Sequence, residues 1–146
     1  MTRRQYGIAI AVVFALIVVA AIAMSLTFTL RSYRALPADV PDHFDGYGWP
    51  DAFGPRPMIF AVIVAEALAV VIWAALLRQW FIENDLRFVV ASGFAASGLL
   101  WTLAWMQKKI LRVASGKAER MDKPYEPLLV LFAGIVFAVA TNLVMK

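Results

Sequence analysis

Four long apolar segments alternate with short polar segments along the chain. They cover about residues 6–30, 58–77, 86–106 and 128–145 and consist mainly of Ala, Val, Ile, Leu, Phe and Met. A helix rises about 1.5 Å per residue, so about 20 apolar residues cross the roughly 30 Å hydrocarbon core of a bilayer. The pattern predicts one membrane domain over residues 1–146, an all-α integral membrane protein with an antiparallel bundle of four transmembrane helices.

The longest polar interruption in the first half of the chain is residues 36–56, between the first two apolar segments. It contains the only histidine, and five of the seven prolines lie between positions 37 and 57. Proline removes a backbone donor and pushes the preceding residue out of the helical region, while Gly46, Gly48 and Gly54 favour turns. We therefore expect one ordered, extended, proline-rich loop here.

Two further polar segments join the predicted helices. Residues 78–87 mix acids, bases and aromatic residues, which is typical of an interfacial turn, and Asn84 or Asp85 is placed to cap the next helix. Residues 107–123 carry six bases and two acids with apolar residues between them. This pattern predicts a turn or two of basic amphipathic helix on the membrane surface, ended by Pro124 and Pro127.

Small residues recur on the third apolar segment. Spacings of three and four residues place them on one helix face, where small side chains let backbones approach closely. We expect this face to pack against another helix. Its members are Ser92, Gly93, Ala96 and Ser97.

Glu66 is an acid inside the second apolar segment. It lies about eight residues into the span, near 12 Å from the loop end, where a carboxylate is costly unless it faces the bundle neutralised or paired. At the same depth, Ser25 of the first helix and Ser97, Trp101 or Thr102 of the third come within reach. Glu66 is either a protonated group that joins helices by hydrogen bonds or part of a proton or ligand pathway.

Composition narrows the functional classes. Hydrophobic residues make up 62% of the chain and charged residues 16%, which is far from the balance of soluble proteins. The net charge is +4, but the bases are spread over loop ends, so lipid headgroups rather than nucleic acid are the expected counterions. There is no cysteine, no histidine pair for a heme and no glycine-rich phosphate loop. We expect no cofactor and no enzyme activity in this chain alone.

The loop at 36–56 also holds a candidate metal site. Imidazole and carboxylate ligands suit zinc and other divalent ions, and His43 lies among Asp42, Asp45 and Asp51. The alternative is structural, with aspartates capping backbone N–H groups and Arg56 pairing an acid. We favour the structural role. If His43 titrates near neutral pH, the loop is also a candidate pH-sensitive element.

Fixed Pro, Gly, His, Asp and aromatic residues recur at close spacing in and beside this loop: Leu36, Pro37, Pro41, His43, Phe44, Asp45, Gly48, Pro50, Asp51, Phe53, Gly54 and Arg56. With the two flanking helices, this pattern resembles a bacterial membrane family, domain of unknown function 1648, which is the N-terminal module of SdpI-type toxin-immunity proteins. Two departures are Arg56, where the family more often has lysine, and the lack of the additional membrane region of the longer immunity proteins. The resemblance implies a multi-pass protein of the bacterial cytoplasmic membrane with its termini inside and this loop outside.

Charge counting favours the opposite orientation. The first and third loops carry nine Lys and Arg residues against five on the other side, and basic loops tend to stay in the cytoplasm. We follow the orientation of the family.

Three functions fit the sequence. The first is an immunity-like or signalling protein whose 36–56 loop binds a peptide, lipid or protein partner. The second is an accessory subunit of a larger respiratory, photosynthetic or transport complex, and the third is proton-coupled translocation through Glu66. The expected partners are the lipid bilayer and either another protein or a second copy of the chain.

Overall fold

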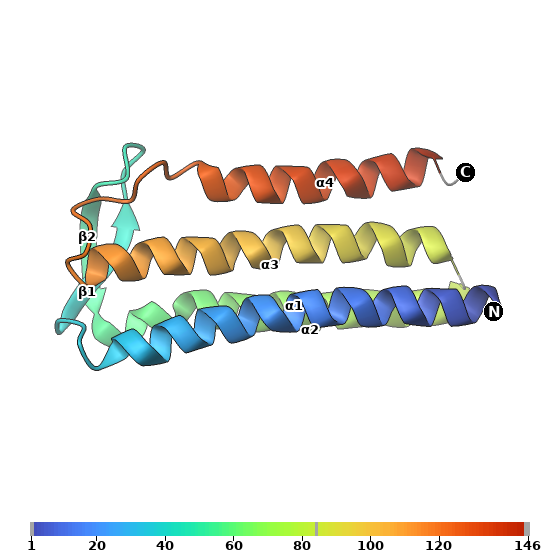
Figure 1. Cartoon of the computed structure of the whole chain (residues 1–146), viewed down its shortest axis with the longest axis horizontal. Helices are drawn as coiled ribbons and strands as arrows, with labels where there is room; N and C mark the ends of the chain where they lie inside the picture. Colours follow the sequence, from blue (N-terminus) through green and yellow to red (C-terminus); the bar gives the residue numbers. More distant parts are fainter. Residues whose placement is uncertain (1, 84, 145–146) are drawn as a thin grey trace.

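The computed structural model of the protein describes residues 2–83 and 85–144, with the backbone alone for residues 81–83. Long helices lie side by side along the molecule, a small hairpin covers one end, and both termini lie at the other end (Figure 1). In chain order the elements are α1 (Arg3–Tyr33), β1 (Asp39–Phe44), β2 (Pro50–Pro55), the 3-10 helix η1 (Arg56–Phe60), α2 (Ala61–Glu83), α3 (Leu86–Ala114) and α4 (Glu126–Val144).

Within the described residues, four helical stretches are long and apolar enough to cross a membrane. Their number is as predicted, and they fit an all-α membrane protein. Large apolar side chains cover the outer helix faces, and Leu16, Val71 and Phe132 are each about two-thirds exposed. A helix that is apolar on all sides suits a lipid surrounding rather than water.

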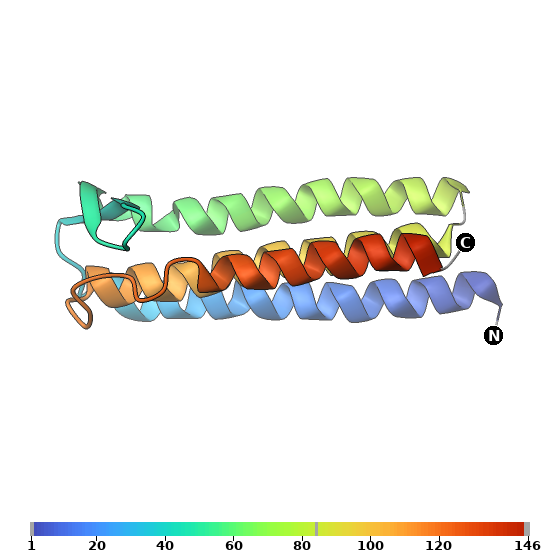
Figure 2. The same cartoon turned by 90° about the horizontal axis from the view of Figure 1, so that it is seen from above.

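Helix α3 is the centre of the arrangement. It packs against α1, α2 and α4, whereas α4 packs mainly against α3. Figure 2 shows α1 and α2 on opposite sides of the molecule, with α4 lying over α3 between them. The predicted bundle is therefore built around one central helix.

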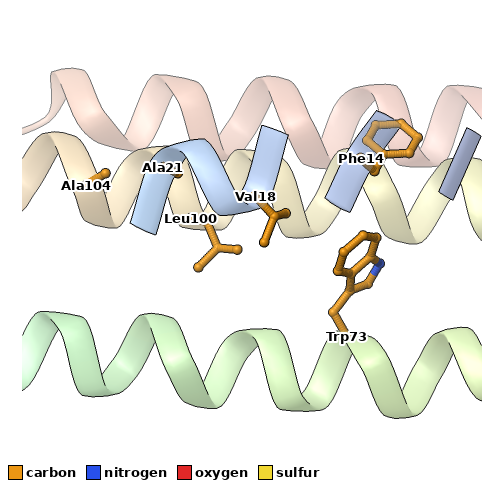
Figure 3. Packing of buried hydrophobic residues seen from close by; sticks show 6 residues of the cluster. All are labelled: Phe14, Val18, Ala21, Trp73, Leu100 and Ala104. Atoms are coloured by element: carbon orange, nitrogen blue, oxygen red, sulfur yellow. The ribbon is translucent and has the colours of Figure 1, made fainter. Parts of the chain in front are cut away.

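The core lies where α1, α2 and α3 meet. Phe14, Val18 and Ala21 of α1 meet Leu100 and Ala104 of α3, and all are buried. Trp73 of α2 points into the same space (Figure 3). Burying this side chain against neighbours from three helices links α2 to the other two.

The small residues of α3 serve two different contacts. A Cβ on Gly93 would overlap the ring of Phe14, so this glycine makes room for α1. Gly98, which the sequence did not single out, faces Gly134 of α4, and a Cβ on Gly134 would lie 2.8 Å from the carbonyl oxygen of Phe94. Of the other predicted members of the face, Ser92 accepts a long hydrogen bond from Trp73 Nε1 (3.4 Å), and Ala96 and Ser97 are half-buried.

Residues 107–123 do not form a separate helix on the membrane surface, so this prediction is wrong. Residues 107–114 are the last two turns of α3, and the chain then crosses the hairpin to reach α4 (Figure 1). The physical reason is a second apolar cluster, in which Leu111 and Ala114 pack against residues of the first loop. The apolar side chains that we expected to lie on the membrane surface instead pack inside the protein. Pro127 lies in the first turn of α4, where proline is tolerated.

Candidate functional site

The first loop is a β-hairpin rather than an unpaired extended segment. Strands β1 and β2 pair antiparallel with Val40 opposite Gly54 and His43 opposite Ala52. The register shifts on both sides of His43. Pro41, Pro50 and Pro55 lack donors, which a two-stranded ribbon tolerates because each strand has a free edge.

Asp45 organises the hairpin tip. Its Oδ1 accepts the backbone N–H groups of Tyr47 (2.8 Å) and Trp49 (2.9 Å), and its own N–H donates to the carbonyl oxygen of Trp49 (2.9 Å). The N–H of Gly48 donates to the Asp45 carbonyl, and Gly48 has a φ of +84° that favours glycine. Asp45 is therefore a turn cap, as the structural alternative predicts.

The segment between α3 and α4 holds this tip in place. The N–H of Met121, a buried residue, donates to the carbonyl oxygen of Gly48 (2.7 Å), and a Cβ on Gly48 would overlap the Met121 carbonyl. The Arg120 guanidinium lies 5.6 Å from the centre of the Trp49 ring. The hairpin is thus braced by a segment more than 60 residues away in sequence.

That bracing segment is itself anchored by charge. Lys109 Nζ of α3 donates to the carbonyl oxygens of Asp122 and Lys123 and pairs with Glu126 at the start of α4 (3.0 Å). Lys123 pairs with the same carboxylate at 3.2 Å. This hydrogen bond from Lys123 to Glu126 raises the pKa of the Lys123 ammonium.

The base of the hairpin packs on the helix ends. Leu36 and Val40 are buried in one cluster with Ile59 of η1 and Leu111 of α3. Arg56 was expected to pair an acid, but its guanidinium donates to the Leu36 carbonyl (3.4 Å) and lies 5.0 Å from the centre of the Tyr33 ring. That expectation is wrong, because the chain brings the arginine to the end of α1 rather than to the aspartates at the tip.

Three aromatic residues of the hairpin are exposed. Tyr47, Trp49 and Phe53 are 79%, 45% and 61% exposed. On the same hairpin, His43 Nδ1 lies 2.6 Å from Asp51 Oδ1, and this pair is also exposed. Among the other loop residues that carry the family resemblance, Pro41 is buried, and Phe44 and Pro50 are half-buried.

The hairpin does not assemble the proposed metal ligands. Among the described residues, no three His, Cys, Asp or Glu side chains lie close enough to hold a metal ion. The Asp45 side chain faces the turn, while Asp51 faces His43. Asp42 lies against Gly54, where a Cβ would come 2.6 Å from its Oδ2.

A network of buried, hydrogen-bonded polar side chains, the buried polar network, lies beneath the hairpin. Ser25 Oγ of α1 donates to Glu66 Oε1 of α2 at 2.6 Å, which is the contact the depth argument predicts. Thr29 Oγ1 donates to the Ser25 carbonyl (2.8 Å) and accepts from Gln107 Nε2 of α3 (2.7 Å). Gln107 Nε2 also donates to the Ile59 carbonyl of η1 (2.9 Å). The buried polar network links three helices to the end of the hairpin.

Two oxygens of the buried polar network, Glu66 Oε2 and Gln107 Oε1, have no hydrogen-bond partner among the described residues. Both side chains are fully buried. A cavity of about 90 Å³ lies beside Gln107 and is also lined by Pro41 and Asp42 of the hairpin. Sequence reasoning missed Gln107, although an amide directly after an apolar run was a visible signal.

The third-helix partners proposed for Glu66 are placed differently. Thr102 Oγ1 faces the carbonyl oxygens of Gly98 (2.8 Å) and Pro127 (2.9 Å), so it joins α3 to α4. Trp101 packs at the edge of the core cluster, and Ser97 Oγ is buried with no hydrogen-bond partner among the described residues. Asp85 is the N-cap of α3, and its Oδ1 accepts the N–H of Arg87, whereas Asn84 lies outside the described residues.

Comparison of the chain with protein-family models, with curated proteins and with solved structures gives no match.

Proposed function

We propose that this chain is a non-enzymatic bacterial membrane protein that binds a peptide or protein partner through its β-hairpin, residues 39–55. One observation supports this most directly. Tyr47, Trp49 and Phe53 are exposed on a hairpin whose tip is already held by Asp45 and by the Met121 contact. Aromatic side chains on a preorganised turn bind a partner with little further loss of conformational entropy.

The hairpin also carries charge, which favours a protein partner over simple anchoring in lipid. Exposed tryptophan and tyrosine alone are typical of a membrane interface. Here Asp39, Asp42 and the His43–Asp51 pair are exposed on the same element. A mixed aromatic and charged surface suits recognition of a polar partner.

The family resemblance supports the same site. Most of the residues that carry the resemblance lie on β1, the turn and β2, and the others flank the hairpin. SdpI-type immunity or signalling proteins would use such an element on the outer face of the cytoplasmic membrane.

Photo-crosslinking in native membranes tests the proposal. A photoreactive phenylalanine analogue at Tyr47 or Phe53 should give a discrete protein adduct, while the same residue at Phe132, equally exposed on α4, should not. Adducts with a stoichiometric membrane complex would identify the protein as an accessory subunit. Only lipid or solvent products at all three positions would overturn recognition by the hairpin.

The buried polar network favours a second candidate function, proton-coupled translocation. Glu66 is fully buried, and its Oε2 has no hydrogen-bond partner among the described residues. The buried polar network extends from Glu66 toward the hairpin end through Ser25, Thr29 and Gln107. An ionisable residue inside a membrane span is a common element of proton relays.

Glu66→Gln tests this second candidate in proteoliposomes with a pH-sensitive dye. Glutamine keeps the size of the side chain and an acceptor for Ser25 but carries no transferable proton, so proton flux should fall to the empty-vesicle level while the thermal midpoint stays near that of the wild type. Ser97→Ala, a buried hydroxyl outside the chain of hydrogen bonds, is the matched control. Equal flux in the Gln variant would exclude a proton role for Glu66.

A further inference from the structure

Four basic side chains surround a hollow at the hairpin end of α1 and α3. Arg31 comes from the last turn of α1, Lys108 and Arg112 lie one turn apart on α3, and Lys117 follows α3. They line two adjoining cavities of about 170 and 380 Å³. Both cavities are lined by Phe28, Ser32, Ser115 and Lys117.

The end of α3 is shaped to place Lys117 at this hollow. Gly116 has a φ of +68°, and the Lys117 N–H donates back to the Arg112 carbonyl at 2.9 Å. This is the hydrogen bond of a Schellman turn, in which glycine takes the left-handed position. The turn folds the chain back, so that Lys117 lines the same cavities as Ser32 of α1.

Ion pairs within the described part of the protein do not neutralise these four bases. None of them forms an ion pair with a described acid, whereas the neighbouring Lys109 and Lys123 both pair with Glu126. No acid lines either cavity. Lys108 and Arg112 are four residues apart on one helix, where like charges destabilise each other. The hollow therefore favours an anion from outside the chain.

The shape and position of the hollow indicate which anion. Guanidinium, ammonium and hydroxyl groups together match the oxygens of a phosphate. Phe28 and Leu111 form an apolar wall, and the Lys108 ammonium lies 5.8 Å from the centre of the Phe28 ring. The hollow also lies at the end of two helices long and apolar enough to cross a membrane. Basic side chains at the ends of spanning helices reach the lipid headgroups.

We propose that the hollow formed by Phe28, Arg31 and Ser32 of α1 with Lys108, Arg112 and Lys117 binds the phosphate headgroup of one anionic membrane lipid. The bases and hydroxyls hold the phosphate, while Phe28 contacts the upper part of the lipid chains. The inference does not depend on the hairpin proposal, since it uses none of the exposed aromatic residues.

Native mass spectrometry of the full chain in neutral detergent, with added phosphatidylglycerol or phosphatidylcholine, tests this. One phosphatidylglycerol should remain bound, and the double variant Lys108→Gln/Arg112→Gln should bind it at least about tenfold more weakly. Lys117→Gln, which lies outside the helices, should also weaken binding. Arg3→Gln/Arg4→Gln at the opposite end removes the same charge and should leave the affinity unchanged.

Soluble competitors distinguish the source of the phosphate. Inorganic phosphate and glycerophosphoglycerol, which lacks acyl chains, should compete at least about a hundredfold more weakly than the lipid, because they gain nothing from the apolar wall. Equal competition would overturn the lipid assignment in favour of a soluble anion. Displacement of the lipid by a polyglutamate peptide would point to an acidic protein segment and also overturn it. Equal binding of phosphatidylcholine, or full binding by the double variant, would remove the site altogether.

Discussion

At the scale of one residue, Asp45 fixes the local structure of the hairpin tip. Its carboxylate accepts two backbone N–H groups in the turn that carries Tyr47 and Trp49, so it sets the positions of two of the three exposed aromatic residues. The same residue type that attracts attention as a metal ligand is used here as a turn cap. The proposed recognition by the hairpin would depend on this cap through the positions of Tyr47 and Trp49.

Asp45→Ala should therefore loosen the tip. Loss of two acceptor contacts is expected to cost about 1 to 2 kcal/mol of local stability and to reduce hydrogen-exchange protection over residues 45–49. Asp45→Asn keeps the carbonyl acceptor and should retain most of the protection. Equal protection in the Ala variant would show that the Met121 contact alone holds the turn.

Asp85 gives a prediction for pH dependence. Its side-chain hydrogen bond with Arg87 lowers the pKa of the Asp85 carboxyl. A carboxyl with a lowered pKa in the folded state stabilises the fold above its unfolded pKa of about 3.9, and this contribution disappears as the pH falls through the folded value.

Thermal midpoints of the wild type and Asp85→Asn should therefore differ at about pH 6, and the difference should shrink as the pH falls below the unfolded pKa of about 3.9. Asparagine also caps helices well, so the difference isolates the charged contact with Arg87. A gap that stays constant over this range would mean that protonation of Asp85 is not its cause.

Glu66 shows what sequence reasoning recovers at single residues. Depth along a helix follows from the fixed rise per residue, and on this basis Ser25 was expected and found as its partner. The rotation of neighbouring helices does not follow from depth, which is why Thr102 was expected near Glu66 but faces α4. Gln107 joins the chain of hydrogen bonds only because α3 continues past its predicted end.

At the scale of elements, α4 depends on one close contact. Gly134 lies against the backbone of Phe94 and Gly98, and a Cβ at position 134 would be 2.8 Å from a carbonyl oxygen and 2.9 Å from a Cα. Backbone atoms cannot rotate away as side chains do, so the helices must separate. Spacings of small residues in the sequence pointed to this type of packing, but not to which glycine meets which helix.

Gly134→Ala should push α4 away from α3 and destabilise the folded protein by about 1 to 3 kcal/mol. Ala133→Val, at the adjacent exposed position, is the control and should change stability by less than about 0.5 kcal/mol. Thermal unfolding in detergent measures both variants. A stable Ala variant would show that α4 tolerates a wider spacing.

The hairpin could be predicted only in part. Prolines and glycines excluded a helix from this loop, and the Asp45 turn follows from ordinary aspartate chemistry. The strand pairing was missed because prolines argue against a sheet. The bracing contact between Met121 and Gly48 was also missed, since no local pattern connects segments so far apart.

At the scale of the whole molecule, all the proposed sites lie toward one end. The hairpin is at the end opposite the termini (Figure 1). The cavity beside Gln107 is lined partly by the hairpin, and the basic hollow is lined by residues near the C-terminal ends of α1 and α3. Apolar spans could be recognised from composition, but this asymmetry follows from α3 extending to Ala114 and meeting the first loop. The orientation of that end in the membrane decides whether a partner reaches it from outside or inside the cell.

Cysteine labelling determines this orientation, because the chain has no cysteine of its own. Tyr47→Cys lies in the turn between β1 and β2, Glu119→Cys lies in the segment between α3 and α4, and Thr2→Cys replaces the N-cap of α1. None of these substitutions changes the Lys and Arg count that biases topology. A membrane-impermeant maleimide should label positions 47 and 119 in intact cells and position 2 only after lysis, as the family orientation implies. Labelling of position 2 alone would place the hairpin in the cytoplasm, and labelling of 47 without 119 would contradict the four-span arrangement itself.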